Sequence, residues 1–408
     1  MPRIQFIFIT IFLDSLGIGL LVPVLPDILR RFTTDAGEVS LYYGYFLSAY
    51  AAIQFLASPV LGSLSDRFGR RPVLLVSLLG AGIDYILMAV APTLSILFIG
   101  RAISGLTGAS MTVASSYMAD ISDDSNRSKN FGLIGAAWGL GFIIGPVLGG
   151  IFEAFGHSGP FVAAAVMNLL NFAFGFFILP ESLAAHHRRP LSFRSMNPFL
   201  SLIKVLKPSS VSIFIWIYFL VYFAGQVHAV NWTLYTQLKF GWTAWQVGLS
   251  LAFVGITNAA SQTLLPRYLV PKIGEYRAFL VGLVICAITF MMFGFVTRPW
   301  MVYPVIAMYA LSAMAFPALQ SIISKETPPS EQGELQGSLV SLGSICAVIA
   351  PFFFTQIFMK FTEPHTSYYF PGAAYVAAGG LCFVALLIAI PVVRRFLREQ
   401  YKAKSTPV

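Results

Sequence analysis

The stretch GSLSDRFGRRPVLL, residues 62–75, gathers four charged residues into six positions between two long apolar runs. These residues are Asp66, Arg67, Arg70 and Arg71. Only 11% of the 408 residues are charged, whereas soluble domains carry roughly a quarter. Such a chain cannot cover a water-facing surface with polar groups, so we expect lipid to be its main solvent. The charged stretch is then a turn between two membrane-spanning segments.

Apolar runs recur from one end of the sequence to the other. Hydrophobic residues make up 57% of the chain, and the mean hydropathy is +0.76. Roughly 20 apolar residues are needed to cross a bilayer as a helix. Runs of this kind lie at 4–25, 42–61, 73–92, 95–118, 130–152, 158–180, 210–235, 245–265, 278–297, 301–322, 336–359 and 370–393. They predict an all-α integral membrane protein with about twelve transmembrane helices. No small-residue cleavage site follows the first run, so we expect a retained helix.

The distribution of basic residues explains the formal net charge of +9. Most of the 26 Lys and Arg residues fall on one side of the predicted spans. The other side carries Arg30, Arg31, Lys239, Arg298 and Lys360. Because cytoplasmic loops are rich in Lys and Arg, we expect both termini to be cytoplasmic. The positive charge is thus a topology signal, and we expect no nucleic-acid partner.

The longest hydrophilic segment divides the predicted spans into two groups of six. We therefore predict an N-terminal six-helix bundle (1–180), a cytoplasmic linker (181–209), a C-terminal six-helix bundle (210–393) and a cytoplasmic tail (394–408). The two groups also match as a repeat, with an offset of 205 residues at three pairs of positions. The pairs are Gly69 and Gly274, Gly132 and Gly337, and Pro146 and Pro351. Related bundles of this kind are common in secondary transporters, which bind substrate between the halves.

Three ionisable residues lie inside predicted spans of the first half. They are Asp14, Asp84 and Arg101. Each costs about 2.5–3.5 kcal/mol on insertion scales, so each needs a partner or a task. Burial favours the neutral form of a carboxyl group, and a nearby arginine favours the charged form. A substrate that competes for Arg101 could therefore change the protonation of an acid, which predicts proton coupling. The alternative is a structural ion pair that holds helices together.

The spans of the second half contain no acidic residue. Their polar residues are instead amides and one histidine, and Gln54 is the matching position in the first half. We predict that these residues line a substrate cavity: Gln54, Gln226, His228, Asn231, Asn258 and Gln262. His228 could also carry a proton. Alternatively, a membrane-embedded amide simply bonds to a neighbouring helix.

The glycine-rich stretch GLGFIIGPVLGG, residues 139–150, lies deep in an apolar run and follows no strand. We therefore do not interpret it as a dinucleotide-binding loop. Gly141, Gly145 and Gly149 are expected to let helices approach closely, and Pro146 is expected to bend the fifth span.

The sequence has no H-E-x-x-H motif, no Walker loop and no Cys/His cluster. Cys286, Cys346 and Cys382 each lie within an apolar span, and we interpret them as packing residues. We expect no metal site, no catalytic site and no cofactor, so an ion gradient would have to supply the energy.

Three motifs resemble signatures of the major facilitator superfamily. GSLSDRFGRRPVLL is similar to its cytoplasmic loop signature, G-x-L-x-D-R-x-G-R-R/K. GLGFIIGPVLGG resembles the fifth-helix motif of its antiporter branch. LFIGRAISGLTGA, which contains Arg101, resembles a fourth-helix motif that is linked to proton coupling. The resemblance implies a fold of two pseudo-symmetric six-helix bundles.

Longer stretches resemble the tetracycline/proton antiporters of that superfamily. These are LDSLGIGLLVPVLPDILRRF, SDRFGRRPVLLVSLLGAGIDY and PALQSIISKETPPSEQGELQGSLVSL. The resemblance implies functional roles for Asp14, Arg30, Gln54, Ser65, Asp66, Arg70, Asp84, Arg101, Asp120 and Gln262. Asn258 and Cys286 depart from the pattern, because those exporters have a histidine and an aspartate there. The resemblance therefore does not carry tetracycline over as the substrate, and it leaves proton coupling to the first half.

In the superfamily the charged turn acts as a latch. The resemblance implies that Arg70 bridges to Asp120, while Asp66 lies against the N-terminus of the eleventh helix. An anion at a helix N-terminus contributes about 0.3–2 kcal/mol, enough to bias two conformations. The expected latch comprises Gly62, Asp66, Arg67, Gly69, Arg70 and Asp120. Because Pro271 and Glu275 replace Asp66 and Arg70 in the second copy, we expect the latch to be one-sided.

The sequence thus predicts a monomeric, proton-driven antiporter of the bacterial inner membrane. It would export amphipathic small molecules by alternating access. One alternative is a dedicated exporter of a single endogenous metabolite, such as a siderophore or a lipid-like molecule, which would not protect cells from unrelated toxic compounds. Others are a proton symporter for uptake and a membrane sensor or scaffold that transports nothing.

Overall fold

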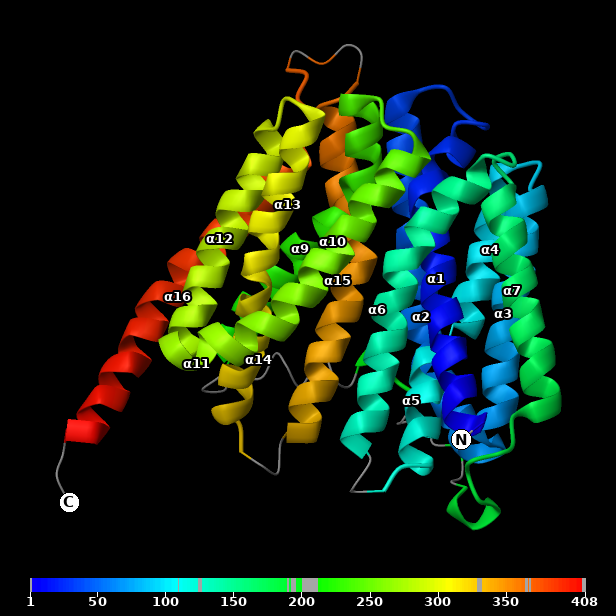
Figure 1. The fold of residues 1–408 in the computed structure, drawn as a ribbon, viewed down its shortest axis with the longest axis horizontal. Coiled ribbons are helices and arrows are strands. Elements are labelled where there is room, and N and C mark those ends of the chain that lie inside the picture. Colours follow the sequence, from blue (N-terminus) through cyan, green and yellow to red (C-terminus); the bar gives the residue numbers. More distant parts are fainter. Residues whose placement is uncertain are drawn as a thin grey trace. The chain divides into compact units, whose positions relative to one another are not determined.

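The computed structural model describes residues 2–108, 110–123, 127–188, 191, 196–199, 212–328, 332–363, 366 and 368–405. Over these ranges every regular element is a helix (Figure 1). Within the described residues, twelve helical segments are long and apolar enough to cross a membrane. The predicted all-α membrane fold is confirmed.

The helices of the first half follow the predicted spans in order. They are α1 (Pro2–Leu29), α2 (Ala36–Phe68), α3 (Arg70–Val90), α4 (Leu94–Thr107), α5 (Ser110–Asp120), α6 (Arg127–Glu153), α7 (Gly159–Ile178) and the short 3₁₀ helix η1 (Ala185–His187). The fourth span combines α4 and α5 and covers Leu94–Asp120.

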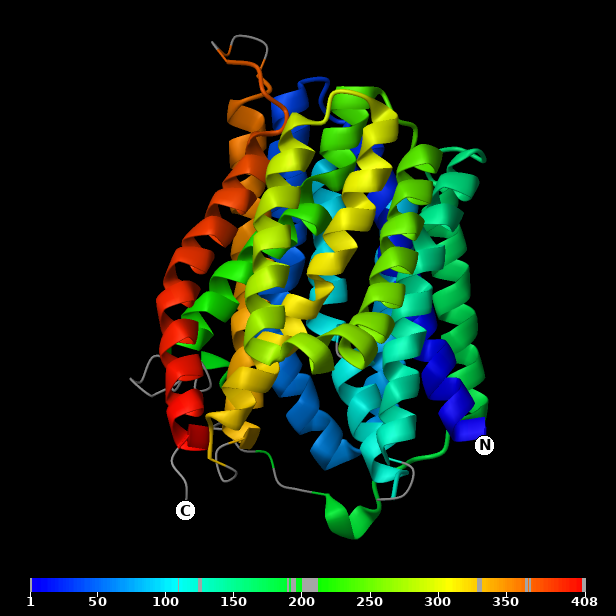
Figure 2. The same cartoon turned by 60° about the vertical axis from the view of Figure 1, so that its left-hand side comes forward.

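The second half has more interruptions. It contains α9 (Ser212–Phe240), α10 (Ala244–Leu264), η2 (Leu265–Leu269), α11 (Val270–Ile273), α12 (Glu275–Phe295), η3 (Pro299–Met301), α13 (Val302–Leu311), η4 (Ser312–Met314), α14 (Ala315–Lys325), α15 (Gln332–Lys360) and α16 (Ala373–Ser405). The segment η2 is a π-helix that contains Pro266, and Figure 2 shows the chain bending there before α12 begins. A proline has no N–H group to donate to the helical ladder, which explains the local change of helix type.

Several helices extend beyond the predicted spans. Helix α2 runs over Ala36–Phe68, whereas hydropathy predicted 42–61. The first half of the charged stretch is therefore helical, and Gly69 is the sole residue between α2 and α3. Helix α16 likewise continues to Ser405, through a segment that we expected to be a tail. The added end of α16 is rich in Arg, Glu, Gln, Lys and Ala, which are good helix formers, so it is helical although it is not apolar.

The two matched glycines of the repeat adopt the same unusual backbone conformation. Gly69 has φ 110° and ψ 160°, and Gly274 has φ 82° and ψ 152°. A positive φ of this size is readily accessible only to glycine. Each glycine ends one helix and begins the next, so the repeat seen in the sequence has a structural counterpart.

The chain forms two compact units. The first comprises Met1–Pro198 and Thr236–Gly255, and the second comprises Phe199–Tyr235 and Ile256–Val408. The end of α9 and the first half of α10 thus belong to the first unit. The predicted bundle boundaries stay a prediction.

Glycine contacts bring helices close together inside each unit. In the first unit, Gly141, Gly145 and Gly149 on α6 face the backbone of α1 at Phe12–Leu20, where no side chain would fit. Helix α6 also packs on α10, where the carbonyl group of Pro146 lies against Gly248. In the second unit, α12 packs along α16 and α14. There the sulfur atoms of Cys286 and Cys382 lie 3.7 Å apart.

Candidate functional site

The interior of the first unit contains a buried ion pair between α3 and α4. Both the Nη2 and the Nε of Arg101 donate to the carboxylate of Asp84, the latter over 3.3 Å. The side chain of Asp84 is fully buried, and that of Arg101 is 6% exposed. The rings of Phe46, Tyr50 and Tyr85 surround the guanidinium group at 5.2–5.9 Å from its Cζ. Arginine and carboxylate thus satisfy each other in an aromatic enclosure.

Asp14, the third ionisable residue, is not part of this pair. It is half-buried on α1, and among the described residues no hydrogen-bond or ion-pair partner for it is found. The Tyr85 hydroxyl packs against Gly17, one turn along α1, and leaves no room for a side chain there. Sequence reasoning grouped the three charges together, whereas the structure separates one acid from the pair.

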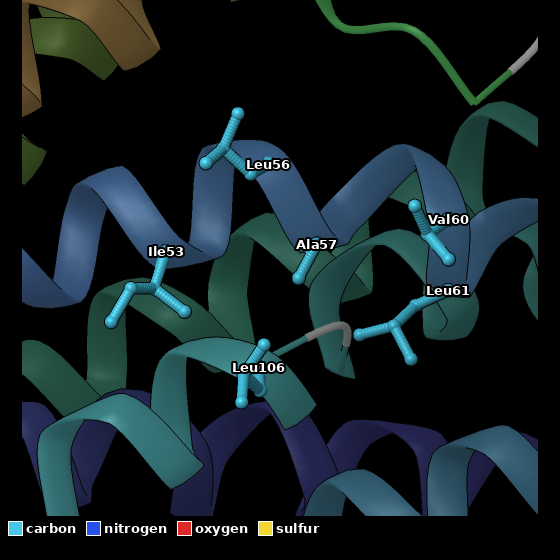
Figure 3. A pocket seen from close by; sticks show the side chains of 6 residues that line it. All are labelled: Ile53, Leu56, Ala57, Val60, Leu61 and Leu106. Atoms are coloured by element: carbon cyan, nitrogen blue, oxygen red, sulfur yellow. The ribbon is translucent and has the colours of Figure 1, made fainter. Parts of the chain in front are cut away.

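Gln54 lies next to these aromatic residues on α2. Its amide nitrogen donates to the Tyr50 hydroxyl and to the carbonyl group of Gly108, each over 3.0 Å. Gly108 is at the break between α4 and α5. A cavity of about 370 Å³ opens nearby between α2 and α4. In Figure 3, Ile53 and Ala57 point from α2 toward Leu106 on α4. The lining is aliphatic: Ile53, Leu56, Ala57, Val60, Leu61 and Leu106.

The charged turn forms a compact network at one end of the first unit. Arg70, whose side chain is 10% exposed, contacts Asp66 at 2.5 Å through Nη1 and Asp120 at 3.2 Å through Nε. The same Nη1 donates to the Ser65 hydroxyl over 2.8 Å. Arg67 is exposed. Arg70 therefore joins the ends of α2 and α5.

Glu181 is a member of this network that sequence reasoning missed. Its carboxylate accepts from the backbone N–H groups of Arg70 at 2.8 Å and Arg71 at 3.2 Å, the first two of α3. The same carboxylate also accepts from the backbone N–H groups of the two residues that follow Glu181 itself, each over 3.0 Å. The carboxylate occupies the space that a side chain at Gly69 would need. Glu181 thus caps α3 from the end of the first half of the chain, because free N–H groups and the helix dipole favour an anion there.

The matching turn of the second unit has an ion pair of its own. Glu275 stands where the first half has Arg70, and Lys325 stands where it has Asp120. The Nζ of Lys325 lies 2.7 Å from Glu275 Oε2, and Ser321 donates to the same carboxylate over 3.0 Å. An ion pair is therefore present at this turn in both units, and the one-sided latch, which was expected because Asp66 and Arg70 have no counterparts in the second copy, stays a prediction. The second copy keeps the pair with its charges exchanged.

Another polar cluster of the first unit lies at the C-terminal end of α1. Arg30 pairs with Asp27 and donates to Gln237 Oε1 over 2.9 Å. The Nε2 of Gln237 in turn donates to Asp27 over 3.0 Å. Gln237 comes from the end of α9, within the first unit, so this triangle joins segments about 210 residues apart. Of these three residues, the resemblance to the tetracycline/proton antiporters implied a role only for Arg30.

The polar residues predicted in the second half lie in different surroundings. The His228 ring is surrounded by Trp232, Phe290, Phe293, Tyr309 and Tyr375, with centroids 4.6–5.4 Å away. Its Nε2 is buried without a hydrogen-bond partner among the described residues. The imidazole thus sits in an aromatic enclosure formed by four helices.

Asn231 is fully buried and donates to the carbonyl group of Phe354 over 3.3 Å. This bond joins α9 to α15, as expected for an amide that links neighbouring helices. Gln226 and Asn258 are half-buried, and Gln262 is exposed. Their role in a substrate cavity stays a prediction.

Comparisons with known proteins show the family to which the chain belongs. A family model described as "Major Facilitator Superfamily" matches residues 7–351 and 268–407. The class C tetracycline resistance protein of Escherichia coli is 39% identical over 386 residues, which cover 95% of each chain. The class E protein of the same organism is 39% identical, over 93% of this chain and 92% of its own.

A solved structure supports the same fold. The crystal structure of the human organic anion transporter MFSD10 (TETRAN) superposes with a TM-score of 0.68 and 23% sequence identity. The match covers 95% of this chain and 98% of that one. At this identity the likeness shows a shared fold.

Proposed function

Because this chain belongs to the major facilitator superfamily, we propose that it is a proton-coupled antiporter that exports amphipathic small molecules. Its relatives at 39% identity are named as tetracycline resistance proteins, which supports drug export. The observation that carries the proton-coupling part of the proposal is the half-buried carboxyl group of Asp14, which has no hydrogen-bond or ion-pair partner among the described residues, whereas Asp84 and Arg101 neutralise each other.

The two acids of the first unit would have different tasks. Asp84 is held by Arg101, and breaking a buried pair by removing one partner costs about 3–5 kcal/mol. This pair would therefore stay ionised and hold α3 against α4. Asp14 has no such partner among the described residues, so it can gain and lose a proton without breaking an ion pair. We assign proton exchange to Asp14 and a structural task to Asp84 and Arg101.

The substrate would have both polar and apolar parts. The half-buried amide of Gln54 offers hydrogen-bonding groups, and the aliphatic cavity between α2 and α4 begins at the neighbouring residue, Ile53. Aliphatic walls favour an apolar moiety through the area that they remove from water. The proton gradient would be the energy source, with no bound cofactor.

Alternating access would use the polar clusters at the two ends of the first unit. The network around Arg70 lies at one end, and the triangle around Arg30 lies at the other. Contacts of this kind can be exchanged between conformations, since each contributes only a few kcal/mol.

Transport by purified protein in liposomes tests the proposal. With an imposed pH gradient, we expect the wild type to move tetracycline, ethidium or both against a concentration gradient. The Asp14→Asn variant should lose this gradient-driven transport and keep exchange of labelled for unlabelled probe, because an amide cannot carry the proton. The Asp35→Asn variant, altered at an exposed N-cap outside the site, is the matched control.

Two results would contradict the proposal. Absence of gradient-driven transport by the wild type for a panel of drugs and dyes would remove drug export. Normal pumping by Asp14→Asn would remove Asp14 from the mechanism.

The chain would lie in the bacterial inner membrane as a monomer with both termini in the cytoplasm. The one-sided distribution of Lys and Arg supports this orientation. A C-terminal alkaline phosphatase fusion should be inactive, and a C-terminal green fluorescent protein fusion should be fluorescent. The opposite pair of results would reverse the topology.

A further inference from the structure

Two of the three cysteines meet inside the second unit. The sulfur atoms of Cys286 on α12 and Cys382 on α16 lie 3.7 Å apart, within the distance of a hydrogen bond between thiols. Both thiols are free, and the two residues are only 6% and 0% exposed. Cys346 on α15 is equally buried, but among the described residues no second sulfur atom lies within hydrogen-bond distance of it. The unit thus contains one pair of thiols and one solitary thiol.

The packing of α12 on α16 explains why the two thiols meet. A row of buried small residues, three or four positions apart, runs along α16: Ala374, Ala378, Cys382, Ala385 and Ala389. Small residues let two helix backbones approach closely in lipid. A side chain added at Gly372, just before α16, would collide with the backbone of Gly294 on α12. One added at Gly379 would press on the carbonyl group of Ala287, the residue after Cys286. The contact between the thiols is therefore set by the packing of two helices.

We propose that Cys286 and Cys382 form a covalent modification site, at which a lipid-soluble two-electron oxidant joins α12 to α16 through a disulfide. In this step both S–H bonds break and one S–S bond forms. The oxidant is a quinone or an azodicarbonyl compound. It takes up the two electrons and the two protons and leaves as the quinol or the hydrazine. The step leaves no charged group in the lipid, where a charge is costly.

The geometry favours a disulfide over other products of these thiols. Each sulfur atom has to move on the order of 1 Å to reach the bonding distance of about 2 Å, and rotation of the two side chains supplies this movement. The product contains no added atom, so it fits a close-packed interface, whereas a bound metal ion or an attached organic group needs extra space. In the part of the chain that the structure describes, no group of three Cys, His, Asp or Glu residues could hold a metal ion.

Counting thiols in the full-length protein in liposomes tests the proposal. The protein is first reduced and then treated with diamide, an azodicarbonyl compound that dissolves in lipid. After unfolding in detergent, the remaining thiols are labelled with a maleimide that carries polyethylene glycol and are counted by gel shift. We expect the wild type to bind three labels before oxidation and one label after it. Mass spectrometry of the unreduced digest should find the peptide of Cys286 joined to that of Cys382.

Single substitutions separate this pair from a general reactivity of buried thiols. The Cys346→Ala variant should fall from two labels to none, whereas Cys286→Ala and Cys382→Ala should each keep both of their labels. The disulfide should also raise the midpoint of thermal unfolding of the wild type by several degrees, because it restricts the unfolded chain. Diamide should leave the midpoint of Cys286→Ala unchanged.

Two results would overturn the inference. One is a wild type that still binds three labels after diamide treatment, and the other is a disulfide that includes Cys346. Neither measurement depends on transport, so the inference stands or falls separately from the proposed function.

Discussion

The turns at Gly69 and Gly274 are two copies of one design with opposite charges. Both glycines have a positive φ, and both stand between the same pair of helices of their repeat. The first turn is packed and buried, with the Glu181 carboxylate against Gly69 and Arg70 tied to two acids. The second is more open, since a side chain added at Gly274 would meet no atom of the described residues within 4 Å. The backbone geometry is shared, whereas the surrounding contacts have diverged.

The difference in burial indicates that substitutions are tolerated less well in the turn at Gly69 than in the turn at Gly274. The side chain of Arg70 is 10% exposed, while Glu275 and Lys325 are 30% and 65% exposed. A pair in water contributes about 0–1 kcal/mol, because solvent screens it. A buried charge that loses its partners costs considerably more. We therefore expect the same substitution to have unequal effects in the two copies.

The largest difference should come from replacing the two glycines. Backbone strain should cost Gly274→Ala about 1–3 kcal/mol. Gly69→Ala should cost about 1–3 kcal/mol more, since its side chain would collide with the Glu181 carboxylate. Thermal unfolding of the purified protein in detergent measures both losses. Adding Glu181→Ala to Gly69→Ala should recover part of the extra loss of stability. Equal losses at the two glycines would show that the difference in packing does not contribute to stability.

The next difference should appear when the first charged residue after each glycine is removed. Arg70→Ala leaves Asp66 and Asp120 without their partner, so we expect turnover in liposomes to fall on the order of tenfold with little change in apparent substrate affinity. Glu275→Ala should keep turnover within about twofold, because its pair is exposed. Loss of affinity with normal turnover in Arg70→Ala would contradict a latch and would point to a role in binding.

The smallest effect should come from exchanging the charges of the second pair. Glu275→Lys and Lys325→Glu each place like charges together and should each cost about 0.5–1 kcal/mol, whereas the double variant should return to within about 0.5 kcal/mol of the wild type. The same exchange in the first copy, Arg70→Glu with Asp120→Arg, should not recover stability, because Asp66 and Ser65 also depend on Arg70. Recovery in both copies would make the two turns equivalent.

Much of the fold was predictable from hydropathy and repeat spacing. Each predicted span matches a membrane-spanning helix, because burial of apolar residues in lipid leaves a long and simple signal. The ends of α2 and α16 were missed, since a polar helix that projects beyond the lipid has no such signal. The pairing of Arg101 with Asp84 rather than Asp14 depends on how the helices rotate about their axes, which composition does not specify.

Two further contacts were missed for different reasons. Glu181 follows an apolar span directly and looked like the first residue of a linker, so nothing near it in sequence indicated that it caps α3. The Glu275–Lys325 pair was missed because we searched the second copy for the same residues as in the first. A repeat can keep an interaction while exchanging its partners, and a search for pairs of opposite charge at the matched positions would have found it.

The one-residue connection at Gly69 also limits how the chain can be assembled. One residue spans at most about 3.8 Å, far less than the ~30 Å of hydrocarbon that a spanning helix crosses. In the folded protein, helices α2 and α3 therefore cross the lipid as a hairpin, with Arg67, Arg70 and Arg71 at its tip. Because carrying three arginines through the lipid would be very costly, the tip of this hairpin resists transfer to the other side of the membrane and helps to fix the orientation of the chain.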